Sequence, residues 1–516
     1  MSRYVIGIDV GTEGVRAGVF DERGARVGTG VAPIETTHPH PGWAEQDVGG
    51  WEAALAAAVR GALAAAEVGA DRIEGLAADG TTSTVVLLDD AGRPLRPALL
   101  WMDVRAHREA QRVAATGHPA LACTAGDAVS AEWFPCKLLW LRDHEPENYA
   151  RASMALELTD WLACRLTGSV TGAISSASMR MFYDDARGGI PRSLYERLGI
   201  GDALAKLPAR YADAGTLAGS LTADAAAALG LRSGIPVAVA GADAAIAVLG
   251  MGVVAPGRLA LVTGSSHVHF TLLDHEARPP GLFGSYPNGL VRGTHLLEGG
   301  QVSTGSVLRW FADRFLPPSL HEEAGRRGRS LVQELDARAA EVPIGSDGVL
   351  VLEHFQGNRT PWSDPTSRGV IRGLSLGHGP EHVARAIMES VACGTAVIAR
   401  RIAAAGGALG ETVMCGGVTR SELWSQIHAD ALGTPITIPA EHEAPMLGSA
   451  VAASVAAGVH PDIRSAAERM TRADRVVEPV LGHTERYAFL VDRYERTYEA
   501  LADESHRLVA WSEGAG

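Results

Sequence analysis

Two short turns rich in glycine, threonine and serine are the parts of this sequence best suited to hold an anion. Gly11-Thr12-Glu13-Gly14 follows an apolar run that contains Asp9, and Thr263-Gly264-Ser265-Ser266 follows a second apolar run. Exposed backbone N–H groups with hydroxyls beside them form an anion cradle, so two such turns facing each other could grip a triphosphate. Asp9 could hold Mg²⁺, directly or through water. An ordinary hairpin turn is the alternative interpretation of each.

Asp243 is the strongest candidate for a general base. It follows the apolar run 236–240 among small residues, where a helix is expected to begin. Transfer of a phosphoryl group to an alcohol needs a carboxylate that accepts the hydroxyl proton. An N-cap aspartate is the structural alternative.

A third glycine loop, Gly416-Gly417, follows an apolar strand and opens a helix. Paired glycines there permit close approach of a flat ligand or a phosphate. A simple strand-to-helix turn would have the same sequence.

Polar side chains in three stretches could bind a polyol, although each alone is more often a cap or an ion pair. The pairs His38/His40 and His267/His269 have no carboxylate or cysteine set around them, which argues against a metal site. The candidates for polyol binding are Asp79, Thr81, Thr82, Asp103, Arg105, Glu298 and Gln301.

Two common nucleotide-binding motifs are absent. A P-loop ends in Gly-Lys-Ser/Thr, and neither lysine of the chain, Lys137 or Lys206, stands in that setting. Gly7, Gly11 and Gly14 have the wrong spacing for the dinucleotide fingerprint, and a strand rather than a helix is expected to follow them. A P-loop phosphotransferase is excluded, and a nicotinamide dinucleotide site is poorly supported.

The composition is that of a folded globular protein. The chain has 516 residues, of which 46% are hydrophobic and 21% charged, and at about 150 residues per domain this suggests several domains. A net charge of -14 without a basic stripe argues against nucleic acid as a partner. Five scattered cysteines fit a reducing cytoplasm. Asp9 stands where a signal peptide needs an apolar core, which argues against secretion. Asp243 lies in the middle of the candidate membrane span 236–255, so we predict a buried strand, turn and helix there instead.

Alternating strands and helices predict an α/β chain. An apolar strand, a turn of small polar residues and a return strand occur twice, at 4–29 and 258–274, which predicts two domains of similar plan with a junction near residue 250. Further strands are predicted at 72–78, 85–88, 236–240, 348–353, 412–415 and 435–438, and helices at 51–66, 104–115, 301–315, 325–340, 380–405, 420–432 and 445–457.

Together these residues resemble the FGGY carbohydrate kinases, which phosphorylate sugars and polyols with ATP. The resemblance covers nearly the whole chain. The N-terminal signature of the family is met in part by Lys137-Leu-Leu-Trp140-Leu141, with Phe134 where the family favours Pro, Ser or Thr. The C-terminal signature is met by Gly369-Val-Ile-Arg-Gly-Leu374, seven further residues, His382-Val383 and Ala386-Ile-Met-Glu389.

The resemblance implies two RNase-H-like domains, as in actin-like ATPases, with the active site in the interdomain cleft. Residues 1–250 would be the sugar-binding N-terminal domain and residues 251–516 the nucleotide-binding C-terminal domain. ATP and Mg²⁺ would be the cofactors, with Asp9 serving the metal and Asp243 acting as catalytic base. The implied nucleotide-binding residues are Asp9, Gly11, Thr12, Glu13, Thr263, Gly264, Ser265, Ser266, Gly416, Gly417 and Ser421.

Three stretches resemble the ribulokinase branch of the family: 79–89, 101–106, and Glu298-Gly-Gly-Gln301 with Gly357-Asn-Arg-Thr360. The branch glutamate contacts sugar, and the family often has lysine where Arg180 stands, which leaves the identity of the sugar open. We predict an ATP-dependent kinase that phosphorylates the terminal hydroxyl of a pentulose, with ribulose as the favoured substrate. The implied substrate-binding residues are Asp79, Thr81, Thr82, Asp103, Arg180, Asp243, Glu298 and Gln301.

Other functions stay open at this point. Within the family they are a xylulokinase or a kinase of another ketose or polyol. Outside it they are an actin-like nucleotide switch without a sugar substrate, or a sugar-sensing regulator that leaves ATP uncleaved. The expected partner is a small-molecule sugar in the cytoplasm, with no nucleic acid and no membrane, and a homodimer is one open assembly state.

Overall fold

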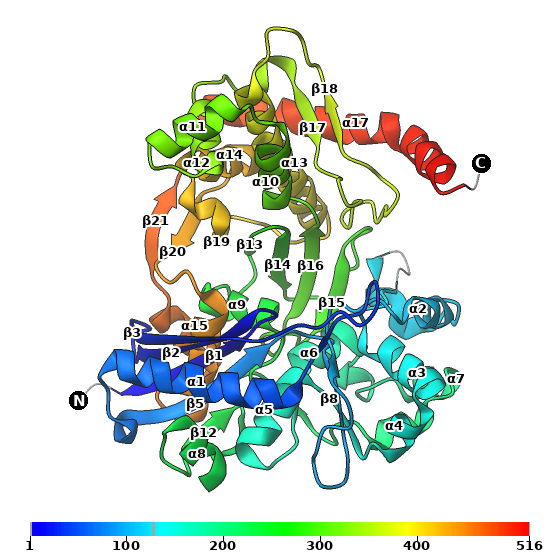
Figure 1. Ribbon diagram of the computed structural model, residues 1–516, viewed down its shortest axis with the longest axis vertical. Helices are drawn as coiled ribbons and strands as arrows, with labels where there is room; N and C mark the ends of the chain where they lie inside the picture. The colour runs from blue at the N-terminus through cyan, green and yellow to red at the C-terminus, as the bar shows by residue number, and fades with distance from the viewer. Residues whose placement is uncertain (1–2, 126–128, 515–516) are drawn as a thin grey trace.

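Two mixed β-sheets built on the same plan organise the molecule (Figure 1). The computed structural model describes residues 3–125 and 129–514. The first sheet consists, in spatial order, of β11 (Leu217–Ser220), β12 (Pro236–Ala238), β5 (Ile73–Gly80), β1 (Tyr4–Val10), β2 (Gly14–Asp21) and β3 (Arg26–Pro33). The second consists of β15 (Phe283–Pro287), β16 (His295–Gln301), β14 (His267–Leu273), β13 (Arg258–Thr263), β19 (Glu411–Gly416), β20 (Ile436–Pro439) and β21 (Ala473–Val477).

The pairing pattern is the same in both sheets. Strands β1, β2 and β3 are antiparallel neighbours, and β5 and β12 continue from β1 in parallel. Likewise β13, β14 and β16 are antiparallel, and β19 and β20 continue from β13 in parallel. The duplicated strand-turn-strand pattern predicted from the sequence is therefore confirmed as a duplicated sheet. Because parallel strands end at the same edge, the loops that follow them gather there, which is where open α/β sheets bind ligands.

Helices α9 (Asp243–Gly250) and α15 (Ala444–Ala456) cross in backbone contact between the two sheets. A Cβ added to Gly448 of α15 would lie 2.0 Å from the carbonyl oxygen of Ile246. Helix α15 also covers β1 and β5, where a Cβ on Gly7 would meet its backbone at 1.9 Å. A helix from the last quarter of the chain thus packs on the first sheet. The division at residue 250 stays a prediction, and this packing crosses it.

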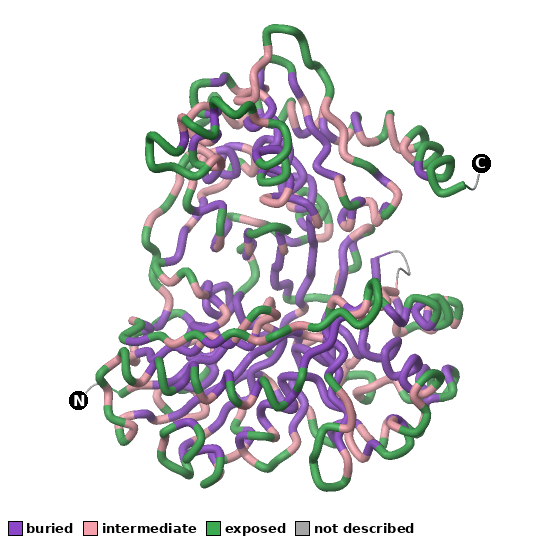
Figure 2. The backbone as a smooth tube through the Cα atoms, viewed as in Figure 1, coloured by how far each residue is buried: buried purple, intermediate pink, exposed green. Residues whose placement is uncertain are grey.

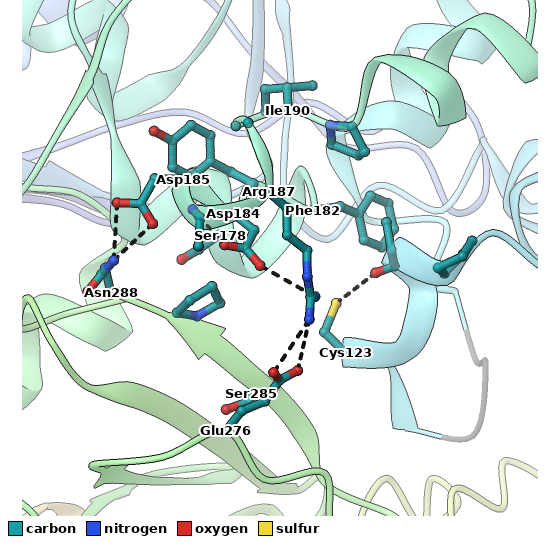
Figure 3. A pocket seen from close by; sticks show the side chains of 18 of the residues that line it. Cys123, Ser178, Phe182, Asp184, Asp185, Arg187, Ile190, Glu276, Ser285 and Asn288 are labelled. Carbon is teal, nitrogen blue, oxygen red and sulfur yellow. Dashed lines mark hydrogen bonds and ion pairs between the residues drawn. The ribbon is translucent and has the colours of Figure 1, made fainter.

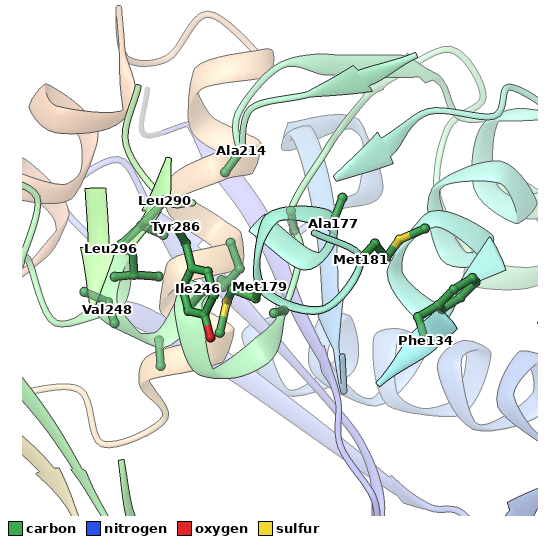
Figure 4. Packing of buried hydrophobic residues seen from close by; sticks show 14 of the residues in the cluster. Phe134, Ala177, Met179, Met181, Ala214, Ile246, Val248, Tyr286, Leu290 and Leu296 are labelled. Atoms are coloured by element: carbon green, nitrogen blue, oxygen red, sulfur yellow. The ribbon is translucent and has the colours of Figure 1, made fainter. Parts of the chain in front are cut away.

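One of several clusters of buried apolar side chains continues between the two sheets. Met179 of α6 (Ile174–Arg180), Ile246 and Val248 of α9, and Tyr286 and Leu296 of the second sheet belong to one cluster (Figure 4). Figure 2 shows buried backbone running through both sheets and exposed backbone at the far end of α17 (Leu481–Ser512).

Within residues 3–125 and 129–514, one helix, α13 (Pro380–Ala404), has the length and apolar composition of a membrane span. Its 18-residue apolar window is 89% buried inside the protein, as expected for a core helix.

Most predicted elements are present with shifted ends, and two predictions in the second half are wrong in part. The helix expected at 301–315 begins at Gly305, because β16 extends to Gln301. The helix expected at 325–340 is two helices, α11 (Pro318–Arg326) and α12 (Leu331–Ala339). They are separated at Gly328, which has a φ of +64°, and α12 starts with a capping box at Ser330.

Candidate active site

Three aspartates gather at the carboxyl edge of the first sheet. Asp9 on β1 lies beside Asp79 in the parallel pairing with β5. Ala242 bridges Gly80 at the end of β5, so Asp243 emerges at the same edge. Helix α9, which begins at Asp243, lies between the two sheets and contacts β13 and β14 of the second (Figure 1).

The positive charge near these three carboxyl groups is too small to offset the effect of burial, so the pKa of each is raised. Burial raises the pKa of Asp9 to about 6 against the opposing charge of Arg16, and the charge of Asp243 adds to the rise. Burial, followed by the charge of Asp9, raises the pKa of Asp79 well above its usual range. Burial also raises the pKa of Asp243, against the Ala244 N–H and the charges of Arg16 and Arg180. Raised carboxyl pKa values grouped in this way are typical of sites that move a proton or bind a cation.

The fit to Mg²⁺ is supported by an unpartnered oxygen. Asp79 accepts a hydrogen bond from Ser449 Oγ at 2.7 Å through Oδ2, and its buried Oδ1 has no hydrogen-bond partner among the described residues. Mg²⁺ is usually held by one or two carboxylates together with substrate phosphates and water. Asp9, with Asp79 behind it, therefore supplies a suitable donor set.

Asp243 is not an N-cap. The N-cap of α9 is Ala242, and Asp243 is the first helical residue, partly exposed, with Oδ1 accepting the Ala244 N–H at 2.6 Å. Asp243 thus accepts one N–H of the first helical turn through Oδ1, and its role as a base stays a prediction.

Arg16 belongs to the candidate site by its contacts, although it was not predicted from the sequence. It lies opposite Asp9 in the β1–β2 hairpin, with Nη2 3.0 Å from Asp9 Oδ2 and Nη1 3.3 Å from Glu443 Oε2. Counting cross-strand partners outward from the turn would have identified it, because directly opposed residues in an antiparallel pair share a face.

The first turn is held from both sides. The Gly11 N–H donates to Gly14 O at 3.0 Å, and Gln46 Nε2 donates to Thr12 O at 2.7 Å. Trp101 Nε1 donates to Thr12 Oγ1 at 2.9 Å, while Glu13 stays exposed. The turn is therefore a fixed surface onto which an anion could dock. Trp101 was not among the predicted site residues.

The second turn presents Gly264, Ser265 and Ser266 to solvent. Its carbonyl groups are anchored by the start of α10 (Gly305–Phe315), with Thr304 N–H donating to Ser265 O at 3.0 Å. Thr263 is buried, and its hydroxyl donates to Cys415 O at 2.7 Å. Thr263 thus joins the turn to the third loop, and its neighbours are the residues open to a ligand.

The two glycines of the third loop have different roles. Gly416 has a φ of +96°, and a Cβ there would lie 1.9 Å from Thr263 O, so only glycine fits. A Cβ on Gly417 would meet nothing within 4 Å, so this position borders open space. Ser421 caps α14 (Glu422–Leu432) and donates to Asp336 Oδ1 at 2.5 Å, so its hydroxyl is already engaged.

Arg180 and Glu298 form a buried, bidentate ion pair between the two halves of the chain. Arg180 Nη1 and Nη2 lie 3.0 and 2.9 Å from the Glu298 oxygens, and Tyr286 OH and Arg359 Nη2 donate to the same carboxylate at 3.3 Å. Burial opposes the charge on Glu298, but Arg180 and Arg359 outweigh it and lower its pKa. The charge of Arg180 acts to lower the pKa of Asp243, so the two groups are electrostatically coupled.

The remaining predicted substrate residues are placed differently. Thr81 and Thr84 share a 2.8 Å hydrogen bond, and Thr82 Oγ1 is buried with no partner among the described residues. Asp103 is fully buried, accepting Ala44 N–H at 2.7 Å and two guanidinium N–H groups of Arg105. Both Asp103 oxygens are therefore already occupied by protein donors.

Gln301 lies away from Glu298. The two residues are three apart on β16, so their side chains point to opposite faces. Gln301 Nε2 donates to Glu353 Oε1 at 2.8 Å, and its Oε1 accepts from Thr395 at 2.8 Å, inside the second half. The structure brings Asp9, Asp79, Asp243 and the Arg180 pair together, and leaves Gln301 outside that group.

A pocket of about 1020 Å³ lies elsewhere at the junction of the two halves (Figure 3). Arg187 reaches Glu276 at 3.4 Å there, and Asn288 donates to Asp185 at 3.0 Å. Ser285 of β15 lines it, whereas the predicted site residues do not. Its position therefore adds no residue to the aspartate site.

The arrangement is suited to phosphoryl transfer. A partly exposed carboxylate stands beside a buried carboxylate pair, an arginine and a rigid turn, and the second half contributes exposed serines and an open glycine. Such a reaction requires mainly positioning, charge stabilisation and a proton acceptor.

Comparison with known proteins supports this chemistry. Residues 4–250 match the N-terminal domain and residues 259–457 the C-terminal domain of the FGGY family of carbohydrate kinases. A protein named ribulokinase from Shouchella clausii is 32% identical, with 98% of this chain and 95% of that protein covered. One of the same name from Mycolicibacterium smegmatis is also 32% identical, over 96% and 94%.

Solved structures agree on the fold. The xylulose kinase of Rhodospirillum rubrum is 29% identical and superposes with a TM-score of 0.85, covering 98% of this chain and 100% of that one. The predicted fold class, two RNase-H-like units of the actin-like ATPase type, is confirmed by such neighbours.

Proposed function

The chain belongs to the FGGY family of carbohydrate kinases, and we propose that it phosphorylates the terminal hydroxyl of a pentulose, with ribulose as the favoured substrate. The relatives named ribulokinase support the sugar class, since the chain matches them over nearly its full length. Residues 1–250 would bind the sugar and residues 251–516 the nucleotide. Mg²⁺ as cofactor, a cytoplasmic location and a homodimer stay predictions.

In the proposed reaction Asp243 accepts the proton of the sugar hydroxyl. The hydroxyl oxygen bonds to the γ-phosphorus as the bond to the bridging oxygen breaks, and ADP leaves. Asp9, backed by Asp79, would hold Mg²⁺, which when bound supplies positive charge against the phosphates. The turns at 11–14 and 263–266 would orient the phosphates, and Arg180 with Glu298 would border the sugar.

One observation carries the proposal. Asp243 emerges at the same sheet edge as Asp9 and the first phosphate turn, and its Oδ1 already accepts a backbone N–H. This bond orients the carboxylate and leaves Oδ2 for a substrate hydroxyl. Its raised pKa favours proton acceptance, because a more basic carboxylate is a better acceptor.

The test is Asp243→Asn in an ADP-release assay. We expect kcat to fall by about 10²–10⁴-fold, the range typical of a lost general base, with ADP affinity changed less than about twofold. Asp462→Asn is the matched control, since Asp462 is exposed and its carboxylate caps α16 (Ile463–Met470) through Ser465. Full turnover by Asp243→Asn would reject the assignment.

Xylulose is the second candidate substrate, because the solved relatives include xylulose kinases that superpose over nearly the whole chain. An ADP-release screen over pentuloses, hexuloses and polyols separates the two sugars. ATP turnover indifferent to every sugar would instead favour a nucleotide switch.

A further inference from the structure

Lys137 places a buried ammonium group beneath the loops that follow the first sheet. It lies on α3 (Phe134–His144) and has no exposed surface. Its Nζ donates to three backbone carbonyl oxygens, those of Ser83 at 2.7 Å, Leu100 at 2.5 Å and Trp101 at 3.4 Å. An ammonium has three donors and no acceptor, so its capacity is filled.

Such a group is costly to bury. Removing an ammonium from water is strongly unfavourable unless polar groups replace the water. Here carbonyl dipoles replace it, and no carboxylate among the described residues forms an ion pair with it. Burial lowers the pKa of Lys137 to about 8, against the charges of Asp103, Glu132 and Glu157. An apolar side chain at this position would leave these carbonyl oxygens without the donor, so the donors themselves hold the three carbonyl groups in place.

The first loop that Lys137 holds contains Thr81 and Thr82. Ser83 has a φ of +61°, a left-handed conformation that non-glycine residues adopt only when their surroundings enforce it. Its carbonyl oxygen accepts a hydrogen bond of 2.7 Å from Lys137 Nζ, which ties this turn to helix α3. Without that hydrogen bond, we expect Ser83 to leave its left-handed backbone conformation and the turn to change shape.

The second segment that Lys137 holds leads to the phosphate turn. Leu100 O also accepts the Asp103 N–H at 3.1 Å, which closes the turn after Trp101. The Trp101 indole then donates to Thr12 Oγ1 at 2.9 Å. One ammonium thus ties the threonine loop to the residue that supports the first turn.

We propose that Lys137 is a positioning residue of this kinase, which aligns the sugar-side loop at 81–84 with the phosphate turn through three backbone carbonyls. The inference deepens the proposed function and rests on it. Lys137 bonds directly to the loop at 81–84 but reaches the phosphate turn only through Trp101, so its loss should weaken sugar binding more than nucleotide binding.

The experiment compares Lys137→Met with Lys206→Met, using ribulose and ATP as substrates. Lys206 is the only other lysine, and its ammonium donates to Ala152 O at 2.6 Å in the same half of the chain. For Lys137→Met we expect the sugar KM to rise at least about tenfold and kcat to fall, with ADP affinity within about twofold. For Lys206→Met we expect an unchanged sugar KM.

The KM-against-kcat split separates positioning from folding. A purely structural lysine would reduce the fraction of active molecules, which lowers kcat and leaves the sugar KM unchanged, and that result would overturn the inference. Lys137→Gln keeps two donors and is expected to give an intermediate KM. If neither Lys137 variant folds while Lys206→Met does, the role is structural and the inference fails.

Assays of the wild-type protein distinguish a failure of the role proposed for Lys137 from a failure of the proposed kinase function. Sugar-dependent ADP release by the wild type, with an unchanged KM in Lys137→Met, overturns only the role of Lys137. A wild type that phosphorylates no sugar in the screen overturns the proposed function, and this inference with it.

Discussion

Individual residues in this protein handle buried charge in two ways. Arg180 and Glu298 neutralise each other through two short hydrogen bonds, and Lys137 is satisfied by carbonyl groups. The carboxyls of Asp9 and Asp79, in contrast, stay short of cations, and their pKa values are raised by burial. Unmatched carboxyls destabilise a fold, so their retention at one sheet edge is consistent with a chemical role.

Asp160 is another carboxyl group with a pKa raised by burial, and its ionisation should make the free energy of unfolding depend on pH. Burial raises the pKa of this carboxyl to about 7 against the hydrogen bond it accepts from Ala173 N–H at 2.9 Å. Because the folded-state pKa lies above the unfolded value, the folded state holds the proton more tightly, and stability is lost as pH rises from about 4 through 7. Asp160→Asn keeps the acceptor and has no charge to bury.

We therefore expect Asp160→Asn to be more stable than the wild type at pH 8, by several kcal/mol at about 1.4 kcal/mol per pKa unit, and similar to it near pH 4. Thermal unfolding across this pH range measures the difference. Asp462→Asn is the control, since Asp462 is an exposed cap whose pKa is lowered. A stability difference between wild type and Asp160→Asn that does not change with pH would contradict the assignment.

At the scale of elements, a strand and the turn after it divide structural from binding roles between adjacent residues. The end of β19 must pass close to β13, which Gly416 permits, and the next residue, Gly417, faces open space. The same division separates Thr263, which is buried, from the exposed serines after it. Each turn therefore has one residue that fixes it and others that are free to contact a ligand.

Adjacent alanine substitutions test this division. Gly416→Ala should lower the melting temperature, because its Cβ would collide with Thr263 O and its φ is positive. Gly417→Ala should leave the melting temperature within about 1 °C and raise the KM for ATP severalfold, because the new methyl group enters space proposed for the nucleotide. Unchanged ATP kinetics in Gly417→Ala would remove this loop from the nucleotide site.

At the scale of the whole molecule, the two halves are joined by a helix pair and by one buried apolar cluster with members in both. The α9–α15 crossing is tight enough that only glycine fits at position 448. Because α9 begins with Asp243, this crossing also sets the position of the candidate base. The Arg180–Glu298 pair joins the halves a second time beside the site.

Gly448→Ala should therefore impair stability and turnover together. The added Cβ would lie 2.0 Å from Ile246 O, so α9 must shift and carry Asp243 with it. We expect a lower melting temperature and a kcat reduced at least about tenfold, since small misplacements of reacting groups cost rate steeply. Gly482→Ala, where a Cβ meets nothing within 4 Å, is the control and should behave as the wild type. A normal kcat in Gly448→Ala would show that the crossing does not position Asp243.

Local pattern was enough to predict the duplicated sheet, the turn after the first strand of each sheet and the helix that begins at Asp243, because strand alternation, turn residues and a strand-to-helix junction depend on neighbours in sequence. The roles of these turns and of Asp243 stay predictions. The same reasoning missed Arg16 and Trp101 and grouped Gln301 with Glu298. Arg16 required the hairpin register, and Gln301 required the alternation of faces along β16.

Only the tertiary structure decided which distant groups meet. Arg180 and Glu298 are 118 positions apart, and Ser449 reaches Asp79 across 370 positions. The sequence predicts Asp103 as a ligand-binding residue, but in the folded protein its carboxylate accepts hydrogen bonds from Ala44 N–H and the Arg105 guanidinium. Sequence patterns report what each segment forms by itself, whereas burial and ion pairing depend on which segments share a core, and that is set by the packing of the complete chain.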